Sequence, residues 1–220
     1  MKIFFFKFLT VFFSLMMVFF AIELILNIKS YKNLNKINEK NLDQRTVYEV
    51  YKENLERGKR IAPWMGPAVL NEIDSLYPLS GVSNINTIFC NEVGEWKIYK
   101  SDKYGFNNKN INYEKDIEIL IIGDSFAEGS CVNYENSFQG NFSKKGFNSI
   151  SLGKGGNDTL LSFATLKEYI ENFKPKKVIW FHYVNDVEDI SFIIKNKNKK
   201  KFIFKYLEND DFSQNLILRQ

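Results

Sequence analysis

The chain has few of the residues on which many catalytic and metal sites depend. Its 220 residues include one histidine, His182, and only two cysteines, Cys90 and Cys131. It has no cluster of metal-ligating residues, and the glycine-rich stretch at Gly153 lacks the spacing of a phosphate-binding loop. The formal net charge is only +4, and no pattern indicates nucleic-acid binding. Metal-dependent, phosphate-loop and nucleic-acid-binding functions therefore have no support in the sequence, and no cofactor is expected.

Long apolar runs are present at one place, the amino terminus. The run from Phe8 to Ile28 is interrupted by a single charge, Glu23, and about 20 apolar residues are enough to cross a bilayer. Lysines precede the run and no small-residue cleavage site follows it, which favours an uncleaved signal anchor over a secreted signal peptide. We therefore expect residues 1–28 to be a single-pass membrane anchor that contacts lipid through residues 8–28. Further lysines follow the run, so the positive-inside rule leaves its orientation open.

Composition divides the rest of the chain into three parts. Residues 29–60 are rich in Lys, Asn and Glu, and they predict a polar stalk that is helical or partly disordered. Residues 61–112 read as an irregular segment whose aromatic residues either pack on the domain or line a substrate groove. Residues 113–220 are expected to form one small α/β domain. The lysine-rich run at 195–201 is interpreted as a solvated loop, with an anionic lipid or polysaccharide surface as the alternative.

The most informative stretch, residues 117–129, reads I-E-I-L-I-I-G-D-S-F-A-E-G. Its apolar run from Ile119 to Ile122 has no polar alternation, which predicts a central strand of a parallel sheet covered on both faces. Gly123 allows a sharp turn after this strand, and Asp124 suits the cap of a following helix. Ser125 is then a candidate nucleophile. The alternative is a strand-to-helix turn without chemistry, because short motifs often match by chance.

Two later segments repeat this arrangement. Residues 148–152 predict a second strand, which a glycine-rich loop connects to a helix from Thr159 to Phe173. A third strand is predicted from Lys177 to Tyr183. Right-handed crossovers would place the loops after all three strands at one edge of the sheet. The sequence therefore predicts that this edge brings together one residue from each loop: Ser125, Gly156 and Asn185.

Three ordered blocks resemble the SGNH, or GDSL, family of serine esterases and acyltransferases: G-D-S-F-A-E-G at Ser125, G-G-N-D-T at Gly156 and V-N-D at Asn185. Tyr183-Val184 stands where the family usually has glycine. The strings S-D-K-Y-G-F-N-N at 101–108 and W-F-H-Y-V-N-D-V-E-D-I at 180–190 look like a membrane-anchored bacterial branch of that family.

The resemblance implies a three-layer, flavodoxin-like parallel sheet with strand order 2-1-3-4-5 and a domain outside the cytoplasm. It also implies an acyl-serine at Ser125 and an oxyanion hole that includes Gly156 and Asn185, with Gly123 and Asp124 in support. Non-catalytic roles stay open for two of these residues: Gly156 could form a helix-entry turn, and Asn185 could cap the end of a strand. Outside the cytoplasm, Cys90 and Cys131 are free to form one disulfide.

A serine nucleophile ordinarily needs a histidine as general base. His182 lies three residues before Asn185, so regular strand alternation would point the two side chains to opposite faces, and a structural role for His182 is favoured. The family carries its base in an Asp-x-x-His motif, which residues 195–220 do not match. These residues end in a segment, 211–220, that reads as the start of an amphipathic helix, and the third strand would be an exposed edge. We therefore expect the amino-terminal part of an SGNH-type domain.

Two functions follow as expectations. The first is a membrane-anchored serine ester hydrolase or O-acyltransferase that acts on acylated glycans or lipids. The second is a catalytically inactive, membrane-anchored binding or scaffold module without the Asp-His pair. The substrate and the oligomeric state stay open.

Overall fold

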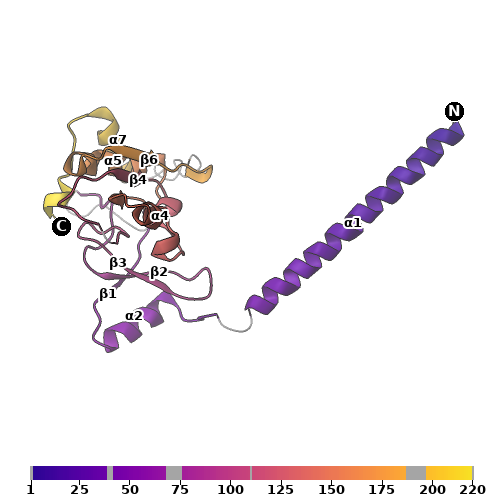
Figure 1. Cartoon of the computed structure of the whole chain (residues 1–220), viewed down its shortest axis with the longest axis horizontal. Coiled ribbons are helices and arrows are strands. Elements are labelled where there is room, and N and C mark those ends of the chain that lie inside the picture. The colour runs from indigo at the N-terminus through magenta and orange to yellow at the C-terminus, as the bar shows by residue number, and fades with distance from the viewer. Residues whose placement is uncertain (1, 39–41, 68–75, 110, 187–196, 220) are drawn as a thin grey trace. The chain divides into compact units, whose positions relative to one another are not determined.

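The computed structural model describes residues 2–38, 42–67, 76–109, 111–186 and 197–219 (Figure 1). The chain separates into two compact units, Met1–Gln44 and Arg45–Gln220. The first unit consists of helix α1 (Lys2–Asn38). Its stretch Phe4–Lys29 has a mean hydropathy of 2.5 and is 0% buried within the protein. The prediction of one amino-terminal helix long and apolar enough to cross a membrane is confirmed.

Two hydroxyl groups in the apolar stretch of α1 are satisfied inside the helix. Thr10 Oγ1 donates to Phe6 O at 2.8 Å, and Ser14 Oγ donates to Thr10 O at 2.9 Å. A hydrocarbon environment offers no water to pair with such groups, so internal bonds of this kind suit a helix in lipid.

The second unit begins with a helix and a small sheet where the sequence predicted a stalk and an irregular segment. Thr46 caps the helix through a reciprocal capping box with Glu49. The helix buries Val50 against Ile61 and Ile88 of the sheet. The sheet has the order β1-β2-β3, with β1 parallel and β3 antiparallel to β2. The bounds are α2 (Val47–Glu56), β1 (Ile61–Pro63), β2 (Asn86–Cys90) and β3 (Lys97–Lys100).

The second sheet is parallel and has the order β5-β4-β6. Its strands are β4 (Ile119–Ile122), β5 (Ser149–Ser151) and β6 (Lys177–Trp180). All four residues of β4 are buried, as the apolar run predicted. Strand β6 is more exposed, with Val178 at 40% and Trp180 at 39%. It also ends three residues earlier than predicted, because Tyr183 N–H donates to the Asp186 carboxylate and the chain turns.

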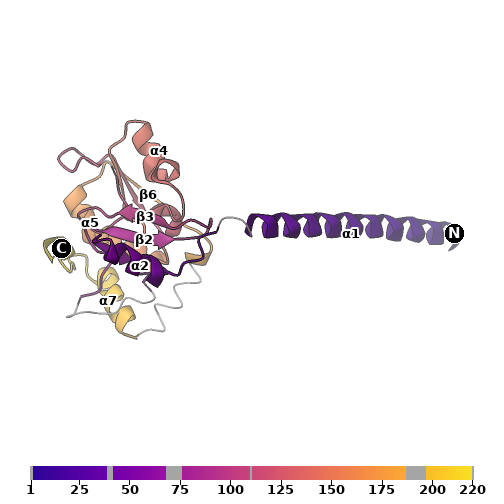
Figure 2. The ribbon, with the colours of Figure 1, turned by 90° about the horizontal axis from the view of Figure 1, so that it is seen from below.

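Helices cover both faces of this sheet, so the second unit is a mixed α/β structure. Leu120 and Ile122 of β4 join the main core with residues of α5 (Thr159–Phe173) and α7 (Lys197–Glu208). Ile119 and Ile121 face the other way and pack with Ala127 and with residues that include Phe142 of α4 (Phe138–Lys144). Figure 2 shows α4 and α7 on opposite sides of the strands. The bounds predicted for α5 are confirmed.

The carboxyl-terminal part differs from two expectations. Residues 197–201 of the lysine-rich run belong to helix α7 instead of a loop, and residues 195 and 196 lie outside the described residues. The expected amphipathic helix at 211–220 is instead a short 3-10 helix, η2 (Leu216–Arg219). The buried Glu168 carboxylate of α5 accepts from the backbone N–H groups of Gln214 and Leu216 at 2.9 and 2.7 Å, which holds the chain in this turn.

The two cysteines form a disulfide that joins the first sheet to the segment after α3. Cys90 is the last residue of β2, and Cys131 follows the short helix α3 (Ser125–Glu128), with a Cα–Cα distance of 5.7 Å. The pairing that the sequence permitted is thus present in the structure.

Candidate functional site

Ser125 lies at the turn between β4 and α3. Gly123 has φ +141°, and a Cβ at this position would approach Phe181 O to 2.5 Å, so the turn requires glycine. Asp124 caps α3 by accepting from Phe126 N–H at 3.0 Å. Ser125 is the first residue of α3, and its half-buried Oγ lies 3.5 Å from Asp124 Oδ2. The serine hydroxyl therefore stands at the carboxyl end of a buried central strand, where ligands of open parallel sheets bind.

The loop after β5, which carries Gly156, packs against this turn. Lys154 N–H donates to Gly123 O at 3.2 Å. Gly153 lies so close to α3 that an added Cβ would come within 2.4 Å of Glu128 N. Gly156 itself is exposed and has φ +75°, a conformation that favours glycine.

The loop after β6, which carries Asn185, also reaches the turn. Phe181 N–H donates to Ile122 O at 2.9 Å, which continues the pairing of β6 with β4 for one residue. The rings of Tyr183 and Phe126 then meet with their centroids 5.4 Å apart. Asn185, itself half-buried, follows in the turn that Asp186 closes. All three loops therefore meet, and the contacts that join them are made by neighbours of Ser125, Gly156 and Asn185.

His182 lies just beyond the end of strand β6. The argument that it points away from Asn185 required a regular strand through residue 185, but β6 ends at Trp180. The His182 side chain is 46% exposed, and its Nδ1 lies 3.2 Å from Oδ2 of the buried Asp186. A carboxylate at Nδ1 orients an imidazole and leaves Nε2 as the outward nitrogen. Strand alternation therefore does not extend to His182, which belongs to the loop that carries Asn185.

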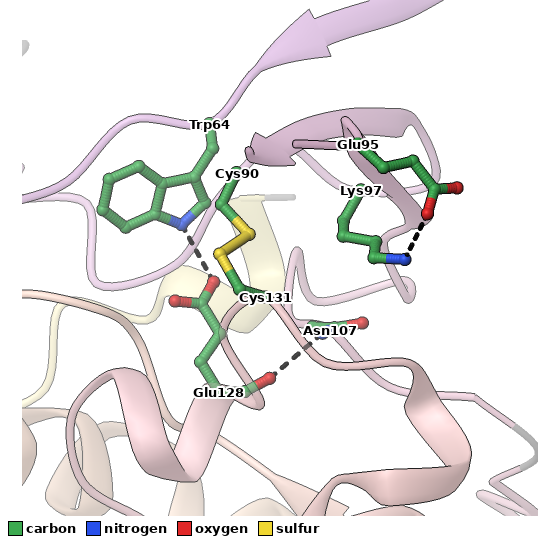
Figure 3. Close-up of a disulfide and its surroundings, with 7 residues drawn as sticks. All are labelled: Trp64, Cys90, Glu95, Lys97, Asn107, Glu128 and Cys131. Carbon is green, nitrogen blue, oxygen red and sulfur yellow. Dashed lines mark hydrogen bonds and ion pairs between the residues drawn. A yellow bond between two sulfur atoms is a disulfide. The ribbon is translucent and has the colours of Figure 1, made fainter. Parts of the chain in front are cut away.

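Sequence reasoning missed a buried polar group beside the turn. Glu128, the last residue of α3, accepts from Trp64 Nε1–H at 2.9 Å, and Figure 3 shows this bond next to the Cys90–Cys131 disulfide. Burial raises the pKa of Glu128, while the charge of Lys154 lowers it. Burial lowers the pKa of Lys154, and Glu128 opposes that shift. Glu128 is part of the sequence block that follows Ser125, but nothing in that block indicates Trp64 as its partner.

Two hollows in the described structure lie away from Ser125. One of about 920 Å³ is lined by residues that precede the strands, among them Glu118, Asn148 and Lys176, so it lies at the opposite edge of the sheet. The other, of about 620 Å³, is lined by β3 and by residues 107–109 and 132–135. Among the described residues no group of three or more His, Cys, Asp or Glu side chains is placed to hold a metal ion.

No protein-family model, curated protein or solved structure matches the chain. The interpretation of the Ser125 turn therefore depends on its own residues and on the geometry of the three loops around it.

Proposed function

We propose that the protein is a membrane-anchored serine ester hydrolase or O-acyltransferase of the SGNH type, with acylated glycans or lipids as substrates. One observation carries the proposal: Ser125 stands at a strand-to-helix turn, and the loops with Gly156 and Asn185 pack around that turn. A structural turn alone would not need two further loops with small or amide-bearing residues at the same sheet edge. The strand order β5-β4-β6 supports the proposal, since it equals the 2-1-3 start of a flavodoxin-like sheet.

The chemistry follows from the roles of the three residues. Ser125 Oγ attacks the ester carbonyl while its proton passes to a general base, and a tetrahedral oxyanion forms. The oxyanion collapses, the bond to the alkoxide oxygen breaks, and the base returns the proton to the departing alcohol, which leaves an acyl-serine. The Ser125 N–H, the Gly156 N–H and the Asn185 side-chain amide are the proposed oxyanion donors. Losing one such donor typically removes about 2.7–4 kcal/mol of transition-state stabilisation. Water or a sugar hydroxyl then accepts the acyl group, which distinguishes hydrolase from transferase.

The disulfide and the apolar helix support a location outside the cytoplasm. Disulfides form and persist in oxidising compartments and are rare in the cytosol. A Cys90–Cys131 bond therefore favours the extracytoplasmic side for the second unit, with α1 as the membrane anchor. Acylated glycans and lipids are the ester substrates that such a domain would meet at a membrane surface.

A fluorophosphonate probe, which reacts covalently with activated serine hydroxyls, tests the proposal. The full chain in detergent micelles should be labelled, and Ser125→Ala should lose the label. Ser130→Ala is the matched control, since Ser130 is also half-buried and lies five residues further along. Equal labelling of wild type and Ser125→Ala would contradict the proposal and favour the inactive binding module.

The same assay assigns the general base. If His182 accepts the proton of Ser125, His182→Ala should be labelled much more slowly than wild type. An unchanged rate would leave His182 with the structural role of pairing with Asp186.

A further inference from the structure

Glu128 is a buried carboxylate to which the proposed chemistry gives no role. Its side chain belongs to α3, the four-residue helix that begins with Ser125, and Glu128 is only 4% exposed. The charge of the buried Lys154 acts on Glu128, but two buried opposite charges are weak evidence for stability, because the cost of their desolvation can exceed their attraction. A carboxylate at this place therefore calls for another explanation, and its hydrogen-bond partners supply one.

Each carboxylate oxygen holds a different part of the chain. Glu128 Oε1 accepts from Trp64 Nε1–H at 2.9 Å, and Oε2 accepts from the Gly155 N–H at 2.5 Å. Lys154, itself 3% exposed, places its Nζ 5.3 Å from the centre of the Trp64 ring. The carboxylate thus links the nucleophile helix to the loop after β5, and Trp64 and Lys154 enclose that link.

The bond to Gly155 acts next to the proposed oxyanion donor. Gly155 precedes Gly156, so fixing the Gly155 N–H restrains the chain that carries the Gly156 N–H. The space is tight, since a Cβ on Gly155 would lie 3.1 Å from the Trp64 ring and 3.2 Å from Glu128 Oε2. Ser125 and Glu128 are the first and last residues of one helical turn, so a single rigid element sets both the nucleophile and the anchor of the donor loop.

We infer that Glu128 is a positioning residue, which holds the Gly155–Gly156 segment at a fixed distance from Ser125 so that the Gly156 N–H meets the developing oxyanion. This inference rests on the proposed function. Correctly placed donors stabilise the transition state without reorganisation, whereas a loose loop must be ordered in each turnover. Removing the anchor should therefore lower kcat and leave KM nearly unchanged, because the ground-state ester does not depend on the donor.

The test uses the full chain in detergent micelles with p-nitrophenyl acetate as substrate. Glu128→Gln keeps the size of the side chain but replaces one acceptor oxygen with an NH₂ donor. We expect kcat to fall by about 10- to 100-fold, less than the ~10²–10³-fold loss of a whole donor. Glu171→Gln, an exposed position on α5, is the matched control and should keep the wild-type kcat. If Glu128→Gln does not fold, Trp64→Phe removes the bond to Oε1 together with the part of the indole ring nearest Gly155, and it should lower kcat by a smaller factor.

Hydrogen–deuterium exchange of the peptide that contains residues 153–157 gives a readout independent of turnover. We expect faster exchange in Glu128→Gln than in wild type or Glu171→Gln. A folded Glu128→Gln variant with wild-type kcat and wild-type exchange would overturn the inference, as would a wild-type result for Trp64→Phe if Glu128→Gln fails to fold. If wild type shows no Ser125-dependent turnover, the proposed function fails, and the exchange data alone decide whether Glu128 holds the loop.

Discussion

The Cys90–Cys131 disulfide offers a quantitative test of how the second unit is held together. The bridge joins residues with a sequence separation of 41, and the chain-entropy treatment of such a loop gives about 4 kcal/mol of stabilisation through the unfolded state. Domains of this size unfold with a total free energy of about 5–15 kcal/mol. We therefore expect reduction of the disulfide to lower the free energy of unfolding by about 4 kcal/mol, a large share of the total.

Urea-induced unfolding of the full chain in detergent micelles measures this loss. The three tryptophans, Trp64, Trp96 and Trp180, all belong to the second unit, so their fluorescence reports on it without a contribution from α1. With a urea m-value of about 1–3 kcal/mol/M, a loss of 4 kcal/mol lowers the midpoint by about 1–4 M. Cys90→Ala/Cys131→Ala is the control, since reductant should leave its midpoint unchanged. A wild-type midpoint that does not move although both thiols are titrated as free would refute the reasoning.

Two further predictions concern the core and the buried carboxylate. Leu120→Ala in β4 should lower the free energy of unfolding by about 2–5 kcal/mol, whereas Val178→Ala on the exposed edge strand should cost less; equal urea midpoints would contradict this. Burial raises the pKa of Glu128 from its ordinary value of 4.5. Above pH 4.5 the folded protein therefore keeps a proton on Glu128 that the unfolded chain has lost. Because the folded state binds more protons, the free energy of unfolding falls as the pH rises towards the raised pKa. Glu128→Gln should flatten this fall in a series of urea midpoints from mildly acidic to neutral pH, and an unchanged slope would count against it.

The parts of the fold that were predicted correctly have local signals. The apolar run of β4 is buried throughout. Helix α5 begins after Asp158, whose side chain accepts from Leu161 N–H, and ends at Phe173, just before Lys174 in the left-handed conformation. Cap residues and a continuous apolar strand can be recognised within a few neighbouring residues. Strand β6 was predicted too long because the side chain of Asp186 ends it, a contact that alternation does not show.

The short strands β1, β2 and β3 were not predicted, because their structure depends on distant contacts. Strand β1 has three residues, too few for periodicity, and it pairs with β2 at the register Ile61 to Asn86. A helical stalk was one of the expectations for residues 29–60, but the burial of Val50 in α2 depends on that sheet. Short strands whose partners lie tens of residues away give almost no signal in sequence alone.

The candidate site also has some features that the sequence predicts and others that depend on distant contacts. Strand order and crossover handedness were enough to predict that the three loops share one sheet edge, and the contacts of Gly123, Lys154 and Tyr183 agree with that placement. The partner of Glu128 was not predictable, since Trp64 lies 64 residues away in sequence. The expectation for the direction of the His182 side chain applied only to a regular strand through residue 185, and β6 ends at Trp180.

The first sheet contacts the α3 region through Trp64 and Cys90. Trp64 follows β1 directly and donates its N–H to Ile88 O of β2 at 2.8 Å, while its indole reaches Glu128. Cys90 at the end of β2 is bonded to Cys131, three residues beyond Glu128. The sheet therefore contacts the chain at and just after α3 by two separate links, one a hydrogen bond and one covalent. A short helix such as α3 has little stability of its own, so a hydrogen bond and a disulfide to the first sheet add support to the turn that carries Ser125 and Glu128.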